Sequence, residues 1–122
     1  LVELSVGFDG VTASAVPVLV ELCQSTQAGA GTSTAFTPLQ IRGWPAVAAS
    51  CTAAVNYTAE PTTLTVVKQW LVTPNGGLIV IQHPLGRELQ GIVAASTIGK
   101  ALIVRCNAPA TVNVRGYLEY EE

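Results

Sequence analysis

The chain of 122 residues has few charged side chains, one histidine and no methionine. Only 11% of its residues are charged, and the six basic ones are scattered along the sequence. Nucleic-acid binding requires a clustered basic surface that neutralises phosphates, so we expect no direct nucleic-acid partner. No apolar run approaches the roughly 20 residues of a membrane-spanning helix, so the sequence also predicts no membrane partner.

Cysteine is too sparse and too dispersed for a metal site. The three cysteines, Cys23, Cys51 and Cys106, are an odd number without the spacing of zinc ligands. Each lies in or beside an apolar stretch, where a thiol acts as a small hydrophobic side chain. We therefore expect buried free thiols without an intrachain disulfide, and neither a metal nor another cofactor.

The single histidine, His83, opens the sequence HPLGRE at residues 83–88. A catalytic histidine needs a nucleophile or an acid within reach, and the only aspartate, Asp9, belongs to a turn signal of its own. The chain contains no GxSxG motif. The proline and glycine of HPLGRE favour a turn, so we interpret it as a polar corner between strands and predict no enzymatic activity. An intersubunit contact through His83 or Arg87 is the other interpretation.

Side chains branched at Cβ are abundant. Val, Thr and Ile number 16, 13 and 6, whereas Glu, Lys and Met number only 7, 2 and 0. Branched side chains are stiff at χ1 and fit a pleated sheet better than a helix. With turn signals about every 8–12 residues, the sequence predicts one all-β domain over residues 1–122. We expect a jelly-roll-like sandwich or a barrel of about eight mostly antiparallel strands.

Alternation of apolar and polar residues locates the strands. We expect a half-buried strand over residues 1–8 and a second strand, which Pro17 opens, over 18–24. A bulged strand over 63–73 and an apolar strand over 78–82 flank the turn sequence PNGG. Because 78–82 is apolar on both faces, we expect it to be central in a sheet. Further strands are expected over 38–42, 52–58, 90–95, 100–106 and 111–120, a loop over 25–36, and helical character only over 46–54.

The surface of the chain is expected to be covered by partners. A mean hydropathy of +0.45 beside 11% charge is unusual for a soluble monomer. The first strand carries one charge, Glu3, which suits an edge strand that another chain covers. Since this strand begins without a methionine, we also expect a short segment before Leu1. The interface candidates are Leu1, Val2, Glu3, Trp44, His83 and Arg87.

Three segments resemble small all-β virion proteins of tailed bacteriophages, of the kind encoded near head genes. The first is FDGVTA at residues 8–13 followed by PVLVEL at 17–22. The second is PLGRE at 84–88, and the third is LIVRC with APATVNVRGYLEYEE, which ends the chain. The similarity extends over most of the chain, except the loop 25–36 and residues 43–55.

The resemblance implies a head decoration, or cement, protein. Such a protein would bind the major capsid protein on the capsid exterior of the virion and bridge neighbouring capsomers, after synthesis in the bacterial host cytoplasm. Proteins of this kind are often homotrimers, and the resemblance brings no catalytic residues. The alternative is a carbohydrate-binding module or tail adhesin, in which Trp44 and Tyr57 would stack on sugars.

Overall fold

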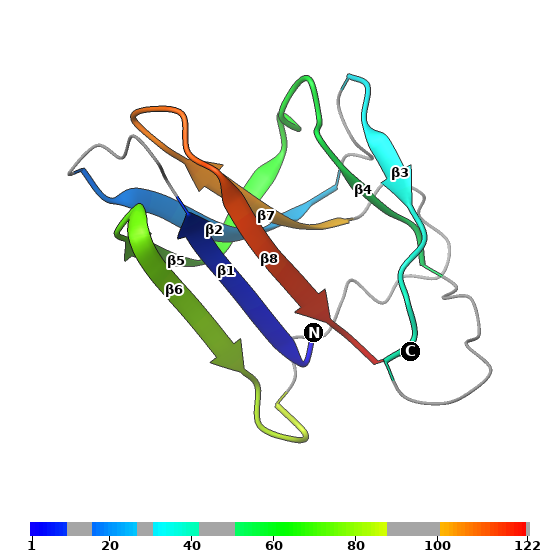
Figure 1. Ribbon diagram of the computed structural model, residues 1–122. Helices are drawn as coiled ribbons and strands as arrows, with labels where there is room; N and C mark the ends of the chain where they lie inside the picture. Colours follow the sequence, from blue (N-terminus) through cyan, green and yellow to red (C-terminus); the bar gives the residue numbers. More distant parts are fainter. Residues whose placement is uncertain (10–15, 27–30, 42–50, 88–100, 122) are drawn as a thin grey trace.

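The protein is all-β in the computed structural model, which describes residues 1–9, 16–26, 31–41, 51–87 and 101–121 (Figure 1). These residues form eight strands and no helix, so the predicted fold class is confirmed. The strands are β1 (Glu3–Asp9), β2 (Val18–Ser25), β3 (Thr34–Phe36), β4 (Ala53–Val55), β5 (Leu64–Val72), β6 (Asn75–Gln82), β7 (Ala101–Asn107) and β8 (Val114–Glu119).

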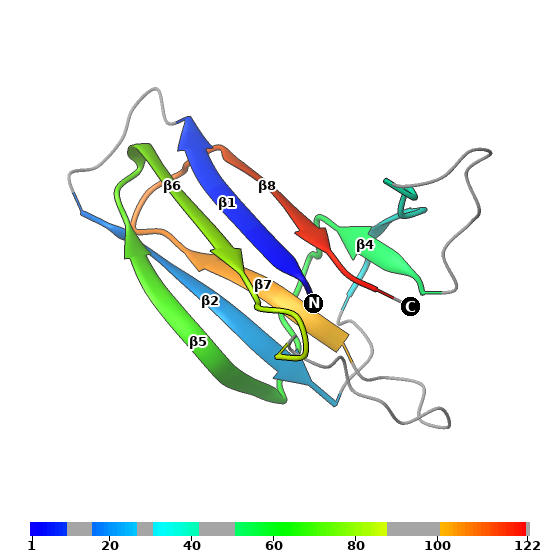
Figure 2. The same ribbon diagram turned by 90° about the horizontal axis from the view of Figure 1, so that it is seen from below.

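Six of the strands form two antiparallel sheets of three. The β1 sheet has the order β6-β1-β8, and the β2 sheet has the order β5-β2-β7. The short β3 and β4 form a separate two-stranded sheet, which lies beyond β8 and away from β6 (Figures 1 and 2). The described strands close no barrel, so the structure is a small β-sandwich and the barrel alternative is wrong. The jelly-roll connectivity stays a prediction.

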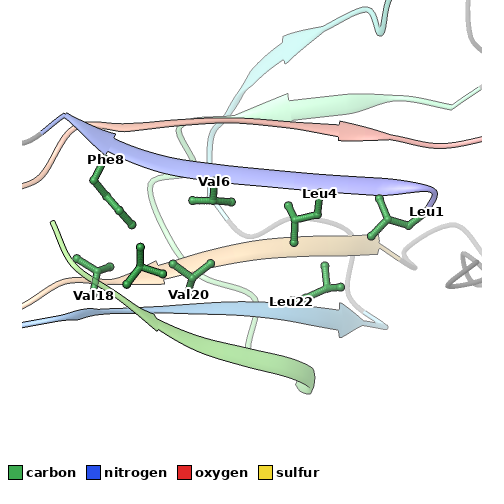
Figure 3. Packing of buried hydrophobic residues seen from close by; sticks show 8 residues of the cluster. Leu1, Leu4, Val6, Phe8, Val18, Val20 and Leu22 are labelled. Carbon is green, nitrogen blue, oxygen red and sulfur yellow. The ribbon is translucent and has the colours of Figure 1, made fainter. Parts of the chain in front are cut away.

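The hydrophobic core lies between the two sheets and is built mainly by their central strands (Figure 3). Alternate side chains of β1 and β2 point toward each other, as the period of two in a strand requires. Each fully buried side chain of this type contributes about 1.5–3 kcal/mol relative to an exposed one. The buried members are Leu1, Leu4, Val6, Phe8, Val18, Val20, Leu22 and Val72.

The positions of β1 and β6 within their sheet are the reverse of those predicted. β1 is central, because β6 and β8 pair with it on either side and place Gln82 and Glu119 opposite Glu3. β6 is at the edge of the described sheet and was wrongly expected to be central. Its outer side chains, Leu78 and Val80, are apolar but exposed. The apolar residues on both faces of this strand predicted that other strands or loops would cover it, but no described residue covers Leu78 and Val80.

The bulge expected in the strand over residues 63–73 is confirmed. Leu22 of β2 lies opposite Lys68, but the next residue, Cys23, lies opposite Val66. Val67 is therefore the extra residue of β5, and the inward side-chain alternation changes phase at this point. Val72 and Trp70 reach the core on one side of the bulge, which explains why simple alternation failed over this strand.

Other predicted elements differ from the structure between β2 and β5. Residues 38–41 form no strand, although one was expected over 38–42. β3 lies inside the stretch predicted as a loop. β4 lies inside the strand expected over 52–58, which is confirmed but shorter, and it replaces the helical character expected at residues 53–54. β3 is only three residues long, and alternation cannot be recognised over so few residues. The predicted strand over 90–95 lies outside the described residues.

Candidate interaction surface

The outer face of the β1 sheet, opposite the core, consists of three rows of side chains. The rows are Gln82–Glu3–Glu119, Val80–Ser5–Tyr117 and Leu78–Gly7–Arg115. In two rows a small β1 residue lies between larger neighbours, and Ser5 is only 6% exposed as a result. Leu78, Val80 and Tyr117 are 66%, 51% and 48% exposed. The outer face therefore presents apolar and aromatic surface from β6 and β8 around a narrow central strand.

One end of this face holds a hydrogen-bonded cluster around Glu3. Its carboxylate accepts hydrogen bonds from the hydroxyl of Tyr117 on β8 and from the side-chain amide of Gln82 on β6. These two hydrogen bonds hold the pKa of Glu3 below its ordinary value, and the bond from Tyr117 has the larger effect. The same bond to Glu3 raises the pKa of Tyr117. The charge of Glu3 is thus hydrogen-bonded within its own chain, and Asp9, the other charge of β1, pairs with Arg115.

Four of the six predicted interface residues meet at this end of the β1 sheet. The backbone N–H of His83 donates to the carbonyl of Val2 at 2.8 Å, and the Val2 N–H donates to the carbonyl of Glu119 at 2.8 Å. Leu1 is 8% exposed and belongs to the core. The edge-strand argument for Leu1, Val2 and Glu3 is wrong, because β6 and β8 of the same chain cover β1. Their contact with another chain stays a prediction.

The turn after β6 has the conformation predicted for HPLGRE. The Arg87 N–H donates to the Pro84 carbonyl at 2.8 Å, and Gly86 has a φ of 79°. Leu85, at the tip, is 91% exposed. None of the ion pairs between described residues includes Arg87, and its predicted contact with another subunit is untested. Trp44, the remaining candidate, lies outside the described residues.

The outer face of the β2 sheet is different, because charged side chains cover its central strand, β2. Glu21 on β2 lies opposite Arg105 on β7, whose Nε donates to the Glu21 carboxylate at 2.7 Å. Arg105 also donates to Glu60, between β4 and β5, at 3.0 Å. Both hydrogen bonds raise the pKa of Arg105, and the bond to Glu21 has the larger effect. Glu21 is 5% exposed and Cys23 is fully buried, so this strand is buried on both faces.

All three cysteines are free thiols, as predicted. Cys23 is buried and Cys106 is half-buried, and desolvation raises the pKa of both thiols. Cys51 is exposed, so the expectation that every cysteine is buried is wrong for this residue. Its thiol donates to the hydroxyl of Tyr120 at 2.9 Å, which ties the start of β4 to the end of the chain.

Residues 31–41 and 51–59, which carry β3 and β4, form a segment that we call the arm. The arm contains no charged residue. Phe36 of β3 and Val55 of β4 share one face of the two-stranded sheet, given its register, and are 50% and 45% exposed. Tyr57, a candidate for stacking on sugars, is 47% exposed. The arm therefore offers a second apolar surface, separate from the β1 sheet.

The described residues hold no recognisable catalytic or metal-binding arrangement. No group of three or more His, Cys, Asp or Glu side chains in the described ranges could hold a metal ion. A cavity of about 240 Å³ is lined by residues 24–26 and 62–65, whose polar side chains are hydroxyls and one amide. No side chain that titrates near neutral pH lines this cavity. No described helix is long and apolar enough to cross a membrane.

The interface candidates predicted from the sequence did not include four residues that lie on the outer face of the β1 sheet, namely Leu78, Val80, Gln82 and Tyr117. The sequence did contain a sign of an uncharged surface at β6, because residues 69–86 contain no Asp, Glu, Lys or Arg. What the sequence does not state is that β8 and β6 flank β1. Without that pairing, Glu3, Gln82 and Tyr117 are three unrelated positions.

The chain matches no protein-family model, no curated protein and no solved structure. The resemblance to phage virion proteins therefore stays a prediction.

Proposed function

We propose that the protein is a structural component of a tailed-phage virion. In this proposal it is a head decoration protein without catalytic activity, which binds the major capsid protein on the capsid exterior and bridges neighbouring capsomers. It acts as a homo-oligomer, and the trimer is chosen by analogy with the proteins it resembles. The observation that carries the proposal is the large exposed apolar surface in a chain with very few charges.

The exposed residues have the composition of a protein interface. Fifteen large hydrophobic side chains of the described residues are exposed. Contiguous apolar patches on a soluble protein are a common sign of binding surfaces. Interface cores are depleted in charge and enriched in aromatic residues, and the arm fits that description. On the outer face of the β1 sheet the uncharged part is that of β6, since β8 carries Arg115 and Glu119 there. A purely monomeric role would leave these surfaces in water.

The distribution of charge supports a structural role over an enzymatic one. Glu3, Glu21 and Arg105 are hydrogen-bonded to neighbouring strands or segments of their own chain. Asp9 is paired with Arg115 at 2.9 Å. These groups cross-link strands of the sandwich, and none of them faces the cavity. A sandwich stiffened in this way suits a protein that bridges other proteins.

The proposal is tested by binding to capsids. Empty capsids assembled from the major capsid protein encoded near this gene would be mixed with the purified protein and sedimented. We expect saturable co-sedimentation at a fixed ratio of this protein to the capsid protein. Capsids of an unrelated phage are the control for non-specific adsorption of an apolar surface.

Two outcomes would contradict the proposal. Absence of co-sedimentation at micromolar concentration would overturn the decoration role. Specific binding on a glycan array, combined with no capsid binding, would favour the carbohydrate-binding module or tail adhesin instead.

A further inference from the structure

Of the four strands at the edges of the described sandwich, β6 alone carries no charged residue. β5 carries Lys68 and the bulge, β7 carries Arg105, and β8 carries Arg115 and Glu119. Charges and bulges are the usual means by which natural sheets prevent pairing with other chains. β6 reads NGGLIVIQ, and its register with β1 shifts only between Asn75 and Leu78, so residues 78–82 carry neither a charge nor a bulge. This edge is therefore suited to being covered.

No described strand pairs with the outer edge of β6, and this edge offers backbone groups as well as side chains. The His83 N–H bonds to the Val2 carbonyl of the neighbouring β1. In an antiparallel ladder, alternate residues bond to the same neighbour, so the backbone groups of Leu78 and Val80 point away from β1. The side chains of these two residues are exposed on the outer face. A partner strand could therefore bond to the edge and pack against Leu78 and Val80.

Within the part of the chain that the structure describes, the apolar face of the arm is left half exposed, as Phe36 and Val55 show. β3 and β4 are three residues long and form a two-stranded sheet of their own. An isolated two-stranded sheet is at best marginally stable in water. The bond from Cys51 to Tyr120 attaches the arm to the end of the chain, while Phe36 and Val55 remain half exposed. The arm would gain stability from a further apolar surface.

We propose that the arm of one copy docks on β6 of a second copy, with Phe36 and Val55 against Leu78 and Val80. Both surfaces are apolar and uncharged, so the contact buries no unpaired charge. The arm lies beyond β8 and β6 lies at the opposite edge of the sheet, so one chain cannot make this contact with itself (Figures 1 and 2).

A contact between two different surfaces of the same chain is heterologous, and repetition of such a contact closes a ring when the rotation permits. A three-membered ring agrees with the trimer of the proposed function. The inference rests on the homo-oligomer in that proposal, but not on capsid binding.

Cross-linking between introduced cysteines tests the contact directly. In a Cys51→Ser background, the double variant Phe36→Cys/Leu78→Cys should form covalent oligomers with a short bismaleimide, whereas each single variant should not. The matched control is Phe36→Cys/Leu71→Cys. Leu71 is 72% exposed against 66% for Leu78, but it lies on β5 in the other sheet. The control should cross-link little.

Light scattering gives the second measurement. Leu78→Glu should weaken self-association at least about tenfold, because a carboxylate would be buried at a contact centre. Leu71→Glu should leave self-association unchanged, and thermal unfolding followed by circular dichroism would show whether each variant is folded. If Leu78→Glu fails to fold, the cross-linking comparison decides alone.

The outcomes separate this inference from the proposed function. Equal cross-linking through Leu71 and Leu78, or a folded Leu78→Glu that assembles like the parent, would overturn arm docking while the homo-oligomer stands. A parent that is monomeric at every concentration would overturn both the docking and the homo-oligomer. Capsid co-sedimentation reports on the decoration role independently of either result.

Discussion

Glu21 on β2 and Arg105 on β7 lie directly opposite each other, and their side chains form an ion pair with a shortest N–O distance of 2.6 Å. The Glu21 side chain is 6% exposed and the Arg105 side chain 29%. A second pair, Asp9 and Arg115, has a distance of 2.9 Å but side-chain exposures of 47% and 83%. The chain thus contains a buried and an exposed arginine–carboxylate pair of similar geometry.

The first prediction concerns these two pairs. Arg105→Gln should destabilise the fold by about 3 kcal/mol, because it leaves the buried Glu21 carboxylate without its cation. Arg115→Gln is the matched control and should change stability by less than about 1 kcal/mol, since water and salt already screen that pair. Urea unfolding of both variants measures the difference. Equal destabilisation would contradict the assigned burial of Glu21.

The second prediction concerns two glycines with opposite surroundings. A Cβ on Gly116 of β8 would lie 2.4 Å from the carbonyl oxygen of Ser5, so the pairing of β1 with β8 must yield. Gly116→Ala should therefore cost about 3 kcal/mol. Gly86 has open space around its Cβ position but a φ of +79°, so Gly86→Ala should cost only about 1 kcal/mol of backbone strain. Thermal unfolding of the two variants should reproduce this order.

Local patterns predicted the strands well where they were long. The alternation at the start of the chain predicted a half-buried strand there, because a period of two is unambiguous over seven residues. The strand expected over 18–24 is β2. The positive φ of Gly86 and the bulge in β5 were also predicted from local sequence. β3, with three residues, carries no readable period and was missed, whereas β4 lies within a longer strand that was predicted over 52–58.

Strand order could not be predicted, because it depends on pairing between distant residues. β1 pairs with β8, more than a hundred positions away, and with β6. No local feature of Glu3 distinguishes an edge strand from a central one. The apolar outer residues of β6 even favoured the wrong answer, since exposed Leu78 and Val80 have the same sequence signature as buried ones. The candidate surface therefore emerged only from the three-dimensional arrangement.

The third prediction concerns the pH dependence of the Glu3 cluster. The pKa of Glu3 is lowered in the folded state by the bonds from Tyr117 and Gln82, so this stabilisation is present above its ordinary value of 4.5. It is lost as the pH falls through the lower pKa of the folded state. The difference in melting temperature between the parent and Glu3→Gln should therefore shrink in acid.

Tyr117→Phe is the companion variant for that experiment. The pKa of Tyr117 is raised above its ordinary value of 10 by the bond to Glu3, so its contribution is present below pH 10 and is lost as the pH rises further. The difference between the parent and Tyr117→Phe should therefore shrink at both ends of the pH range. A difference that stays constant down to pH 3 would show that the cluster does not form in solution.

The last prediction concerns the reactivity of the three thiols. The thiolate is the reactive form, and burial both blocks access and lowers the thiolate fraction of Cys23 and Cys106, whose pKa values are raised by desolvation. Cys51 is exposed. In dilute native protein at pH 8, Ellman's reagent should therefore react fast with one thiol per chain, and with three after denaturation. Cys51→Ser should remove the fast phase and leave two thiols in denaturant. Fast native reaction in that variant would mean that Cys23 or Cys106 is less protected than the structure shows, and a total below three in the denatured parent would reveal a disulfide.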